Sequence, residues 1–411
     1  MLYRNLFLNL KKAYNQEESC ITLDEPELEI RNFSFESSNV SVLPGHKHYK
    51  CERHDRTFGE TYKPNAGVIK EGYPESLSRA DCTIKENGRF RYSLFKKAGD
   101  EKADDLIVLF HGLNERDWYK YLPWAAKLIE LTGRAVLLFP IAFHMNRAPA
   151  EWGNPRAMKK VSDVRNEQFP TIAHSTFVNA AISTRVQSIP QRFFWSGLQT
   201  YRDVIQLIQQ IRGGKHEEIT AHASIDLFAY SIGSFLSEIL MLTNPRGLFD
   251  DTKLLMFCGG PTLDRMYPVS RYILDSEANI ALYSFFIEHL DKEFHRDERL
   301  AHYFSEDHRS GQYFRAMLSY PRRKQEREDR FAELSDRIHA ITLKQDDVVP
   351  PSEVMNTLQG EFRDIPIPVD LFDFPYEYSH VVPFHSLCND AEKVDKHFNQ
   401  VFERAAEFLI T

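Results

Sequence analysis

The fold is decided by the stretch Ile225-Asp226-Leu227-Phe228-Ala229-Tyr230-Ser231-Ile232-Gly233-Ser234-Phe235. An apolar run typical of a buried strand leads into Ser231, and Gly233 follows two positions later. A helical pattern begins at once, with apolar residues at Phe235, Leu236, Ile239, Leu240 and Leu242. A serine on a tight turn between a strand and a helix holds its hydroxyl clear of the backbone. This context predicts a nucleophile elbow at Ser231.

The turn also explains the small residues around the serine. Residues two before and two after Ser231 crowd such a turn, and here they are Ala229 and Gly233. Ala229 stands where glycine is usual and is one methyl group larger. The following helix points its N–H groups and the positive end of its dipole at the site, which favours developing negative charge. The alternative interpretation is a serine in an ordinary strand–helix turn.

Short apolar segments on both sides of this stretch predict the sheet. Five are nearly continuous and a sixth alternates: Leu106–Phe110, Ala135–Phe139, Ile225–Ala229, Leu254–Phe257, Ile338–Leu343 and the alternating Val369–Phe374. Strands buried on both faces of a parallel sheet have this pattern. Helical segments lie between them. Ser196 is a candidate cap for one helix, and the last helix carries the stripe Val394, Phe398, Val401, Phe402 and Ala405. The alternation predicts an α/β fold with a doubly wound, mostly parallel sheet.

The rest of the chain is arranged around this sheet. Residues 141–193 and 262–335 are too long for simple crossovers, so we predict helical insertions there. Asn87-Gly88 lies between two strand-like segments and predicts a two-residue hairpin. Residues 1–80 are predicted to form an N-terminal extension, and residues 81–411 the main domain.

The strand Leu106–Phe110 runs directly into His111-Gly112-Leu113. Gly112 allows the backbone to approach a substrate closely. We predict that the backbone N–H groups of Leu113 and Ile232 form an oxyanion hole, which stabilises the charge of a tetrahedral intermediate. His111 itself is predicted to brace this loop and not to act as the base.

Two further strand ends supply an acid and a base. Asp346 follows the strand Ile338–Leu343 and lies four residues before Pro350, which suits a carboxylate that orients an imidazole. Asp347 is the fallback candidate, and both acids could instead cap the following helix. His380 lies beyond the segment Val369–Phe374 and is the predicted base. His385 is the competitor, although it lies further from the strand.

Together, His111-Gly112, the turn at Ser231, Asp346 and His380 resemble the α/β-hydrolase superfamily, in the order Ser, Asp, His that this superfamily shows. The resemblance covers roughly residues 90–411 and assigns no more specific family. It implies an active site at the carboxyl edge of the sheet and a cap formed by residues 262–335.

The resulting hypothesis is a serine hydrolase that cleaves a carboxylic ester through an acyl-enzyme, with Ser231, His380 and Asp346 as its triad. The substrate would be a small acyl compound, and the reaction needs no cofactor. A peptidase or an acyltransferase would use the same triad. A non-catalytic binding protein of the same fold is the alternative from a different class.

Composition sets the wider limits. The chain of 411 residues has 42% hydrophobic and 27% charged residues, which is typical of a globular protein. A net charge of −8 and the absence of a basic stretch argue against a nucleic-acid binder. No apolar run reaches the ~20 residues that cross a bilayer. Five scattered cysteines, at 20, 51, 82, 258 and 388, and the absence of a secretory signal predict a reducing, cytoplasmic location.

Two weaker motifs remain. The segment His46-Lys47-His48-Tyr49-Lys50-Cys51-Glu52-Arg53-His54 contains His-x-His and Cys-x-x-His, patterns that can bind zinc. Because no second ligand pair is visible in the sequence, we favour a polar loop and predict no metal site. His144 and Arg147 follow the strand Ala135–Phe139 and could contact an anionic substrate group, but packing of the insertion is the favoured interpretation.

Overall fold

A nine-stranded, mostly parallel sheet forms the centre of the molecule. The computed structural model describes residues 2–51, 53–60, 67–305, 307–386 and 390–411. The sheet has the order β1-β2-β5-β7-β6-β8-β9-β10-β11. Its strands are β1 (Cys20–Asp24), β2 (Glu27–Glu36), β5 (Arg89–Lys97), β6 (Ala103–Phe110), β7 (Ala135–Leu138), β8 (Ile219–Tyr230), β9 (Leu254–Phe257), β10 (Ile338–Leu343) and β11 (Val369–Phe372).

The six strands from β6 to β11 are those that the apolar segments predict. They pair in parallel, whereas β1, β2, β5 and β7 pair antiparallel in that order. Alternate residues of β6 enter two different clusters of the core: Leu106 and Val108 lie in one, and Ile107 and Leu109 in the other. Burial on both faces is the reason that these strands lack polar alternation.

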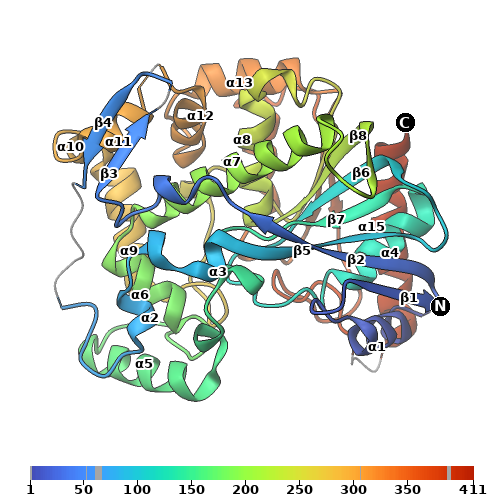
Figure 1. Cartoon of the computed structure of the whole chain (residues 1–411), viewed down its shortest axis with the longest axis horizontal. Coiled ribbons are helices and arrows are strands. Elements are labelled where there is room, and N and C mark those ends of the chain that lie inside the picture. The colour runs from blue at the N-terminus through green and yellow to red at the C-terminus, as the bar shows by residue number, and fades with distance from the viewer. Residues whose placement is uncertain (1, 52, 61–66, 306, 387–389) are drawn as a thin grey trace.

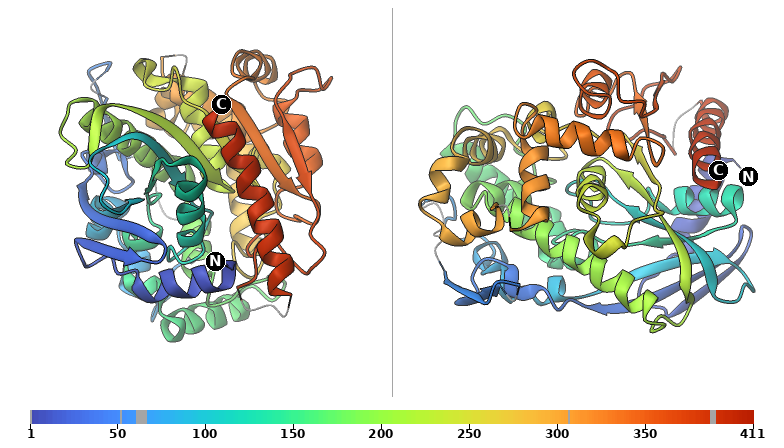
Figure 2. Two further views of the ribbon diagram at one scale, coloured as in Figure 1. Left: turned by 90° about the vertical axis from the view of Figure 1, so that its right-hand side faces the viewer. Right: turned by 90° about the horizontal axis from the view of Figure 1, so that it is seen from above.

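Helices cover both faces of the sheet, as the doubly wound prediction requires. One face packs against α1 (Tyr3–Ala13), α4 (Leu122–Thr132) and α15 (Ala391–Ile410). The other packs against α7 (Arg192–Arg212), α8 (Ile232–Thr243) and α14 (Pro351–Leu358). In the right-hand view of Figure 2, α15 (red) lies on one side of the strands and the yellow-green helices lie on the other.

The helix α15 buries the stripe that its sequence predicts, and α1 packs against both α15 and α4. The first of these contacts includes a hydrogen bond from the Tyr3 backbone N–H to Asp395 Oδ1, over 2.8 Å. The prediction for Ser196 is wrong, because α7 begins four residues earlier, at Arg192. The Ser196 hydroxyl donates to the Arg192 carbonyl within the helix instead of capping its end.

Part of the N-terminal segment extends the main sheet. Strand β2 pairs with β5 from Leu28–Lys97 to Glu36–Arg89, and β1 pairs with β2, so both strands, which lie within residues 1–80, belong to this sheet. The predicted hairpin at Asn87-Gly88 is wrong. Lys85–Gly88 form the single-turn helix α3. The side chain of Asn87 is buried and hydrogen-bonds to Gln199, so tertiary contacts override the turn preference of Asn-Gly.

The two long connections are helical. Residues 141–193 contain α5 (Pro155–Gln168) and α6 (Ala180–Ser188). Residues 262–335 contain α9 (Ser276–Tyr283), α10 (Leu290–Phe294), α11 (Glu298–Tyr303), α12 (Arg309–Leu318) and α13 (Lys324–Glu333). A separate two-stranded sheet, β3 (His48–Cys51) with β4 (Arg56–Gly59), lies beside α11 (Figure 1).

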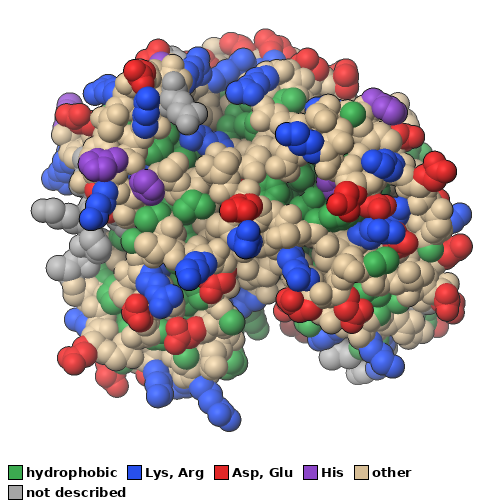
Figure 3. All heavy atoms as spheres, in the orientation of Figure 1, with side chains coloured by type: hydrophobic (Ala, Val, Ile, Leu, Met, Phe, Trp, Pro, Cys, Tyr) green, Lys and Arg blue, Asp and Glu red, His purple; other side chains and the backbone are tan. Residues whose placement is uncertain are grey.

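The surface and the cysteines add three observations. Acidic and basic side chains are interspersed over the face shown in Figure 3. Among the described helices, none is both long and apolar enough to span a membrane. Cys20, Cys51, Cys82 and Cys258 are unpaired thiols, and Cys388 lies outside the described residues.

Candidate active site

Ser231 occupies a strained turn between β8 and α8. Strand β8 ends at Tyr230, α8 begins at Ile232, and the serine between them has φ +56° and ψ −120°. A backbone of this kind costs about 1–3 kcal/mol and persists only where the surrounding structure holds it. A Cβ atom on Gly233 would lie 2.8 Å from Phe110 Cβ and 2.9 Å from the Phe110 carbonyl oxygen. The glycine is therefore required by the close approach of β6.

The structure brings Ser231, His380 and Asp346 into one hydrogen-bonded line. Ser231 Oγ lies 2.8 Å from His380 Nε2, and His380 Nδ1 lies 2.8 Å from Asp346 Oδ2. The three residues are 7%, 3% and 4% exposed. An imidazole between a hydroxyl and a buried carboxylate can accept the hydroxyl proton while the carboxylate stabilises the resulting charge.

The acid is held by the turn that follows β10. Asp346 Oδ1 accepts hydrogen bonds from the backbone N–H groups of Val348, at 3.0 Å, and Val349, at 2.8 Å. Its other oxygen is thereby aimed at the imidazole. The side chain of Asp347 is exposed. Neither acid caps the next helix, because no side chain caps the N-terminus of α14 at Pro350.

The side chains that position His380 were not predicted from the sequence. The ring of Tyr230 stacks on the imidazole, with the centroids 5.5 Å apart and the planes 19° apart, and its hydroxyl donates to the His380 carbonyl. Lys120 Nζ lies 4.5 Å from the centroid of the Tyr230 ring and donates to the Val381 carbonyl. The competitor His385 has no hydrogen bond to Ser231 within the described part of the chain.

Two backbone amides remain available beside the serine. The N–H of Gly112 donates to the Tyr121 hydroxyl over 2.8 Å. Among the described residues, the N–H groups of Leu113 and Ile232 meet no protein acceptor. Ile232 is the first residue of α8, where a helix leaves its N–H groups free. These are the two predicted oxyanion donors, and they are open to a ligand.

His111 is a brace for this loop. Its Nδ1–H donates to the Gly112 carbonyl over 2.8 Å, and its Nε2 accepts from the Ile141 N–H over 2.9 Å. Burial, and then the neighbouring His144, holds the pKa of His111 well below its usual value. The ring is therefore neutral, and both of its nitrogens are occupied by the protein.

Cavities meet at the serine from two sides. One of about 120 Å³ is lined by Ser231, His380 and Leu113, together with Val178 and Tyr272 from the two insertions. A small apolar space of about 30 Å³ also contacts Ser231. A larger cavity of about 490 Å³ is separate from the serine but shares the Leu113 loop, and its wall includes Phe143, Trp152 and Phe193.

The two residues weighed as anion contacts have structural partners. Arg147 is fully buried, pairs with Asp203 at 2.8 Å and donates to Asn87, so it packs the insertion against the sheet. His144 contacts the Ala142 carbonyl through Nδ1 and lines the larger cavity. Burial lowers the pKa of His144 to about 4, which leaves it uncharged near neutral pH.

Comparisons with known proteins add a family and a set of distant structures. A sequence model described as "Family of unknown function (DUF6051)" matches residues 1–410. No curated protein matches the sequence. A cold-adapted esterase from an Arctic intertidal metagenomic library is 10% identical, with a TM-score of 0.35 over 92% of this chain and 94% of that one. A thermostable esterase from Pseudomonas putida is 9% identical, with a TM-score of 0.42 over 98% and 88%.

A third similar structure is prolyl oligopeptidase B from Galerina marginata. It is 10% identical, with a TM-score of 0.41 over 94% of this chain and 37% of the other. Because all three TM-scores lie below 0.5, the functional inference rests on the geometry of this chain alone.

Proposed function

This chain belongs to the family of unknown function DUF6051, and we propose that it is a serine hydrolase of the α/β-hydrolase type that cleaves a carboxylic ester. The observation that carries the proposal is the buried line from Ser231 Oγ through both nitrogens of His380 to Asp346, with 2.8 Å at each contact. The strained backbone of Ser231 adds to it, because such strain concentrates at functional sites.

The proposed reaction is acyl transfer in two halves. His380 Nε2 accepts the proton of Ser231, whose oxygen bonds to the ester carbonyl carbon. The amides of Leu113 and Ile232 hold the oxyanion. As the tetrahedral intermediate collapses, the ester C–O bond breaks and His380 gives the proton to the leaving alcohol. Water then attacks the acyl-enzyme by the same route, which releases the acid and restores the serine.

The cavities limit the substrate. The space of about 120 Å³ next to Ser231 favours a small group beside the reacting carbon. Because Val178 and Tyr272 line it, we propose that residues 262–335 act as a cap, with residues 141–193 completing the wall. The cavity of about 490 Å³ has aromatic walls and would accept a bulky apolar part of the same molecule.

Labelling with a fluorophosphonate tests the proposal, because the probe reacts only with an activated serine. We expect the intact chain to be labelled on Ser231 and to hydrolyse p-nitrophenyl esters, and Ser231→Ala to do neither. The control is Ser237→Ala. Ser237 is buried like Ser231 but lies within α8, and its hydroxyl has no hydrogen-bond partner in the described structure.

The outcomes separate the alternatives. A folded wild-type chain that is not labelled would indicate a binding protein and not an enzyme. An adduct that maps to another residue would contradict the assignment of Ser231. If Ser231 is labelled, a panel of short-chain esters, long-chain esters, sugar acetates and peptides distinguishes an esterase from a peptidase, and adding an acceptor alcohol detects acyl transfer.

A further inference from the structure

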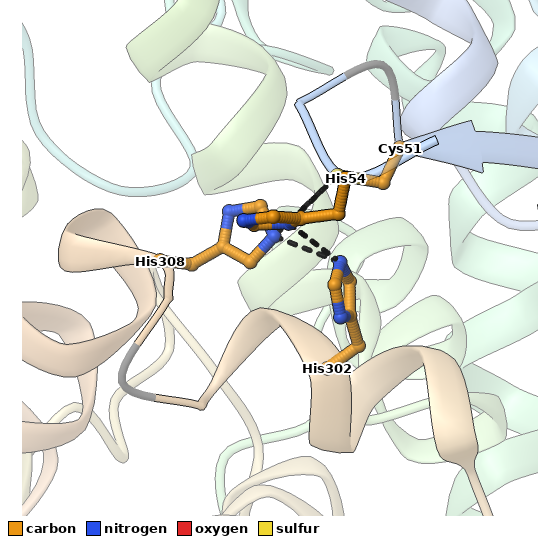
Figure 4. Close-up of side chains that lie close together, drawn as sticks. All are labelled: Cys51, His54, His302 and His308. Carbon is orange, nitrogen blue, oxygen red and sulfur yellow. Dashed lines mark hydrogen bonds between the residues drawn. The ribbon is translucent and has the colours of Figure 1, made fainter. Parts of the chain in front are cut away.

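Four side chains with metal-binding atoms meet at one point, although they come from distant parts of the chain (Figure 4). Cys51 ends β3 and His54 lies in the turn before β4. His302 lies in α11, and His308 immediately precedes α12. One ligand atom from each of the four lies within 4.8 Å of all the others. None of the four lines the cavity at Ser231, so the cluster is distinct from the proposed active site.

Three of the four contact distances between these atoms fit a tetrahedral zinc site. Zinc bonds of about 2.0–2.1 Å to nitrogen and about 2.3 Å to sulfur place tetrahedral ligands roughly 3.3–3.6 Å apart. Cys51 Sγ lies 3.5 Å from both His54 Nδ1 and His308 Nε2, and His54 Nδ1 lies 3.3 Å from His302 Nε2. The two Nε2 atoms of His302 and His308 are 2.9 Å apart. A tetrahedral site would require this last pair to open by a few tenths of an ångström and the two diagonal pairs, which lie within 4.8 Å, to draw closer.

Hydrogen bonds alone satisfy this cluster poorly. A ring nitrogen that carries a proton donates and cannot accept at that atom, whereas each of the four atoms faces two of the others. A proton on any of these four atoms would therefore be shared between two neighbouring acceptors. Cys51, His302 and His308 are buried, where imperfect bonding is costly. A single cation at the centre would bond to all four lone pairs at once.

We propose that Cys51, His54, His302 and His308 bind one Zn²⁺ ion in a structural site that goes beyond the proposed hydrolase activity. A thiolate with three imidazoles is a ligand set for zinc, whereas Mg²⁺ and Ca²⁺ require oxygen ligands. Four protein ligands fill the tetrahedron and leave no position for water or substrate, which is the property of a structural site.

The site would join two segments of the fold. The hairpin β3–β4 has strands of four residues and lies outside the main sheet, and an isolated hairpin of this kind is marginally stable. Zinc would fix it to α11 and α12, across 257 residues from Cys51 to His308. Protein contacts support the same docking, because the rings of Tyr49 and Tyr303 lie edge to face, with centroids 5.6 Å apart.

This second ligand pair is what the sequence could not show. The Cys-x-x-His motif was visible, but its partners lie about 250 residues away. His46 and His48, from the same motif-rich segment, are exposed and do not join the cluster. His46 Nδ1 instead contacts the His48 carbonyl at 2.8 Å. The hairpin therefore offers a matched control histidine.

Metal analysis of the untagged, full-length chain tests the proposal. We expect one zinc per chain by mass spectrometry after reconstitution and dialysis. Replacing zinc by Co²⁺ should give the visible bands of tetrahedral cobalt and a thiolate-to-cobalt charge-transfer band. Cys51→Ser should lose the charge-transfer band, and His308→Ala should bind zinc about 100-fold more weakly or worse. The control, His48→Ala, should match the wild type in all three measurements.

Folding is monitored in the same samples by circular dichroism. Stripping zinc from the wild type with a chelator should lower the midpoint of thermal unfolding, and added Zn²⁺ should restore it. Substoichiometric zinc in the reconstituted wild type, or a cobalt spectrum without the thiolate band, would overturn the proposal without any variant. Equal zinc affinity in folded Cys51→Ser and His48→Ala would also overturn it.

Discussion

Replacing Asp346 by asparagine tests the proposed triad most directly, because the geometry dictates how the amide must sit. One carboxylate oxygen accepts from the backbone N–H groups of Val348 and Val349, and the other accepts from His380. In Asp346→Asn only the amide oxygen can accept, so it keeps the two backbone bonds. The NH₂ group then faces His380 Nδ1, and both would be donors in the active tautomer.

The imidazole must respond by moving its proton to Nε2. That nitrogen lies 2.8 Å from Ser231 Oγ, and once protonated it cannot accept the hydroxyl proton. The base is thus disabled while every buried polar atom keeps a partner. A triad locked in the wrong tautomer loses about 10⁴ in kcat. At about 1.4 kcal/mol for each factor of ten, this corresponds to about 5 kcal/mol of transition-state stabilisation.

The assay is steady-state hydrolysis of a p-nitrophenyl ester, together with the rate of fluorophosphonate labelling. We expect both rates to fall by about 10⁴ in Asp346→Asn, with KM changed little and with the circular dichroism spectrum of the wild type. Asp347→Asn is the matched control, since that neighbouring side chain is exposed. A loss of less than tenfold in Asp346→Asn, or an equal loss in Asp347→Asn, would refute the tautomer argument.

Three further predictions concern the fold and the support of the base. Gly233→Ala should lower the free energy of unfolding by about 1–3 kcal/mol in urea titrations, because its Cβ meets the backbone of β6. Gly197→Ala is the control and should not destabilise the protein, because the space around Gly197 in α7 is open. Burial lowers the pKa of His216 to about 4. Its stabilising contribution is complete above its unfolded pKa of about 6.5 and is lost as the pH falls towards 4. Between pH 6.5 and 5 the wild type should therefore lose about 1.6 kcal/mol more than His216→Gln. Tyr230→Phe keeps the stacked ring but frees the His380 carbonyl, so kcat should fall about tenfold with KM unchanged, and an unchanged kcat would exclude this positioning role.

The parallel sheet was accessible to sequence analysis for a physical reason. Strands buried on both faces cannot carry polar alternation, so their apolar runs stand out even without their partners. The carboxyl ends of parallel strands meet at one edge, and the residues that follow β6, β8, β10 and β11 converge there. Asp346 and His380 were predicted only from their positions after strand ends, and this convergence is the reason that they are hydrogen-bonded.

Other features depend on contacts that no local pattern reports. Asn87-Gly88 has the composition of a hairpin turn, but burial of Asn87 against Gln199 determines its conformation. The ring of Tyr230 stacks on His380 because Tyr230 is the last residue of β8, directly before Ser231. The cluster at Cys51 requires the docking of β3–β4 on α11, which brings together segments that are remote in sequence.

The contact between α1 and α15 has a consequence for biosynthesis. Tyr3 and Asp395 are joined across 392 residues, and the buried side chains Leu6 and Leu10 belong to the same core cluster as those of α15. Chains are made from the amino end, and their early segments usually fold first. Here α1 emerges from the ribosome before α4 and long before α15, the two helices that cover it. Part of its apolar face must stay in solvent or with a chaperone until translation reaches α15, so this part of the native core closes only after α15 has been made.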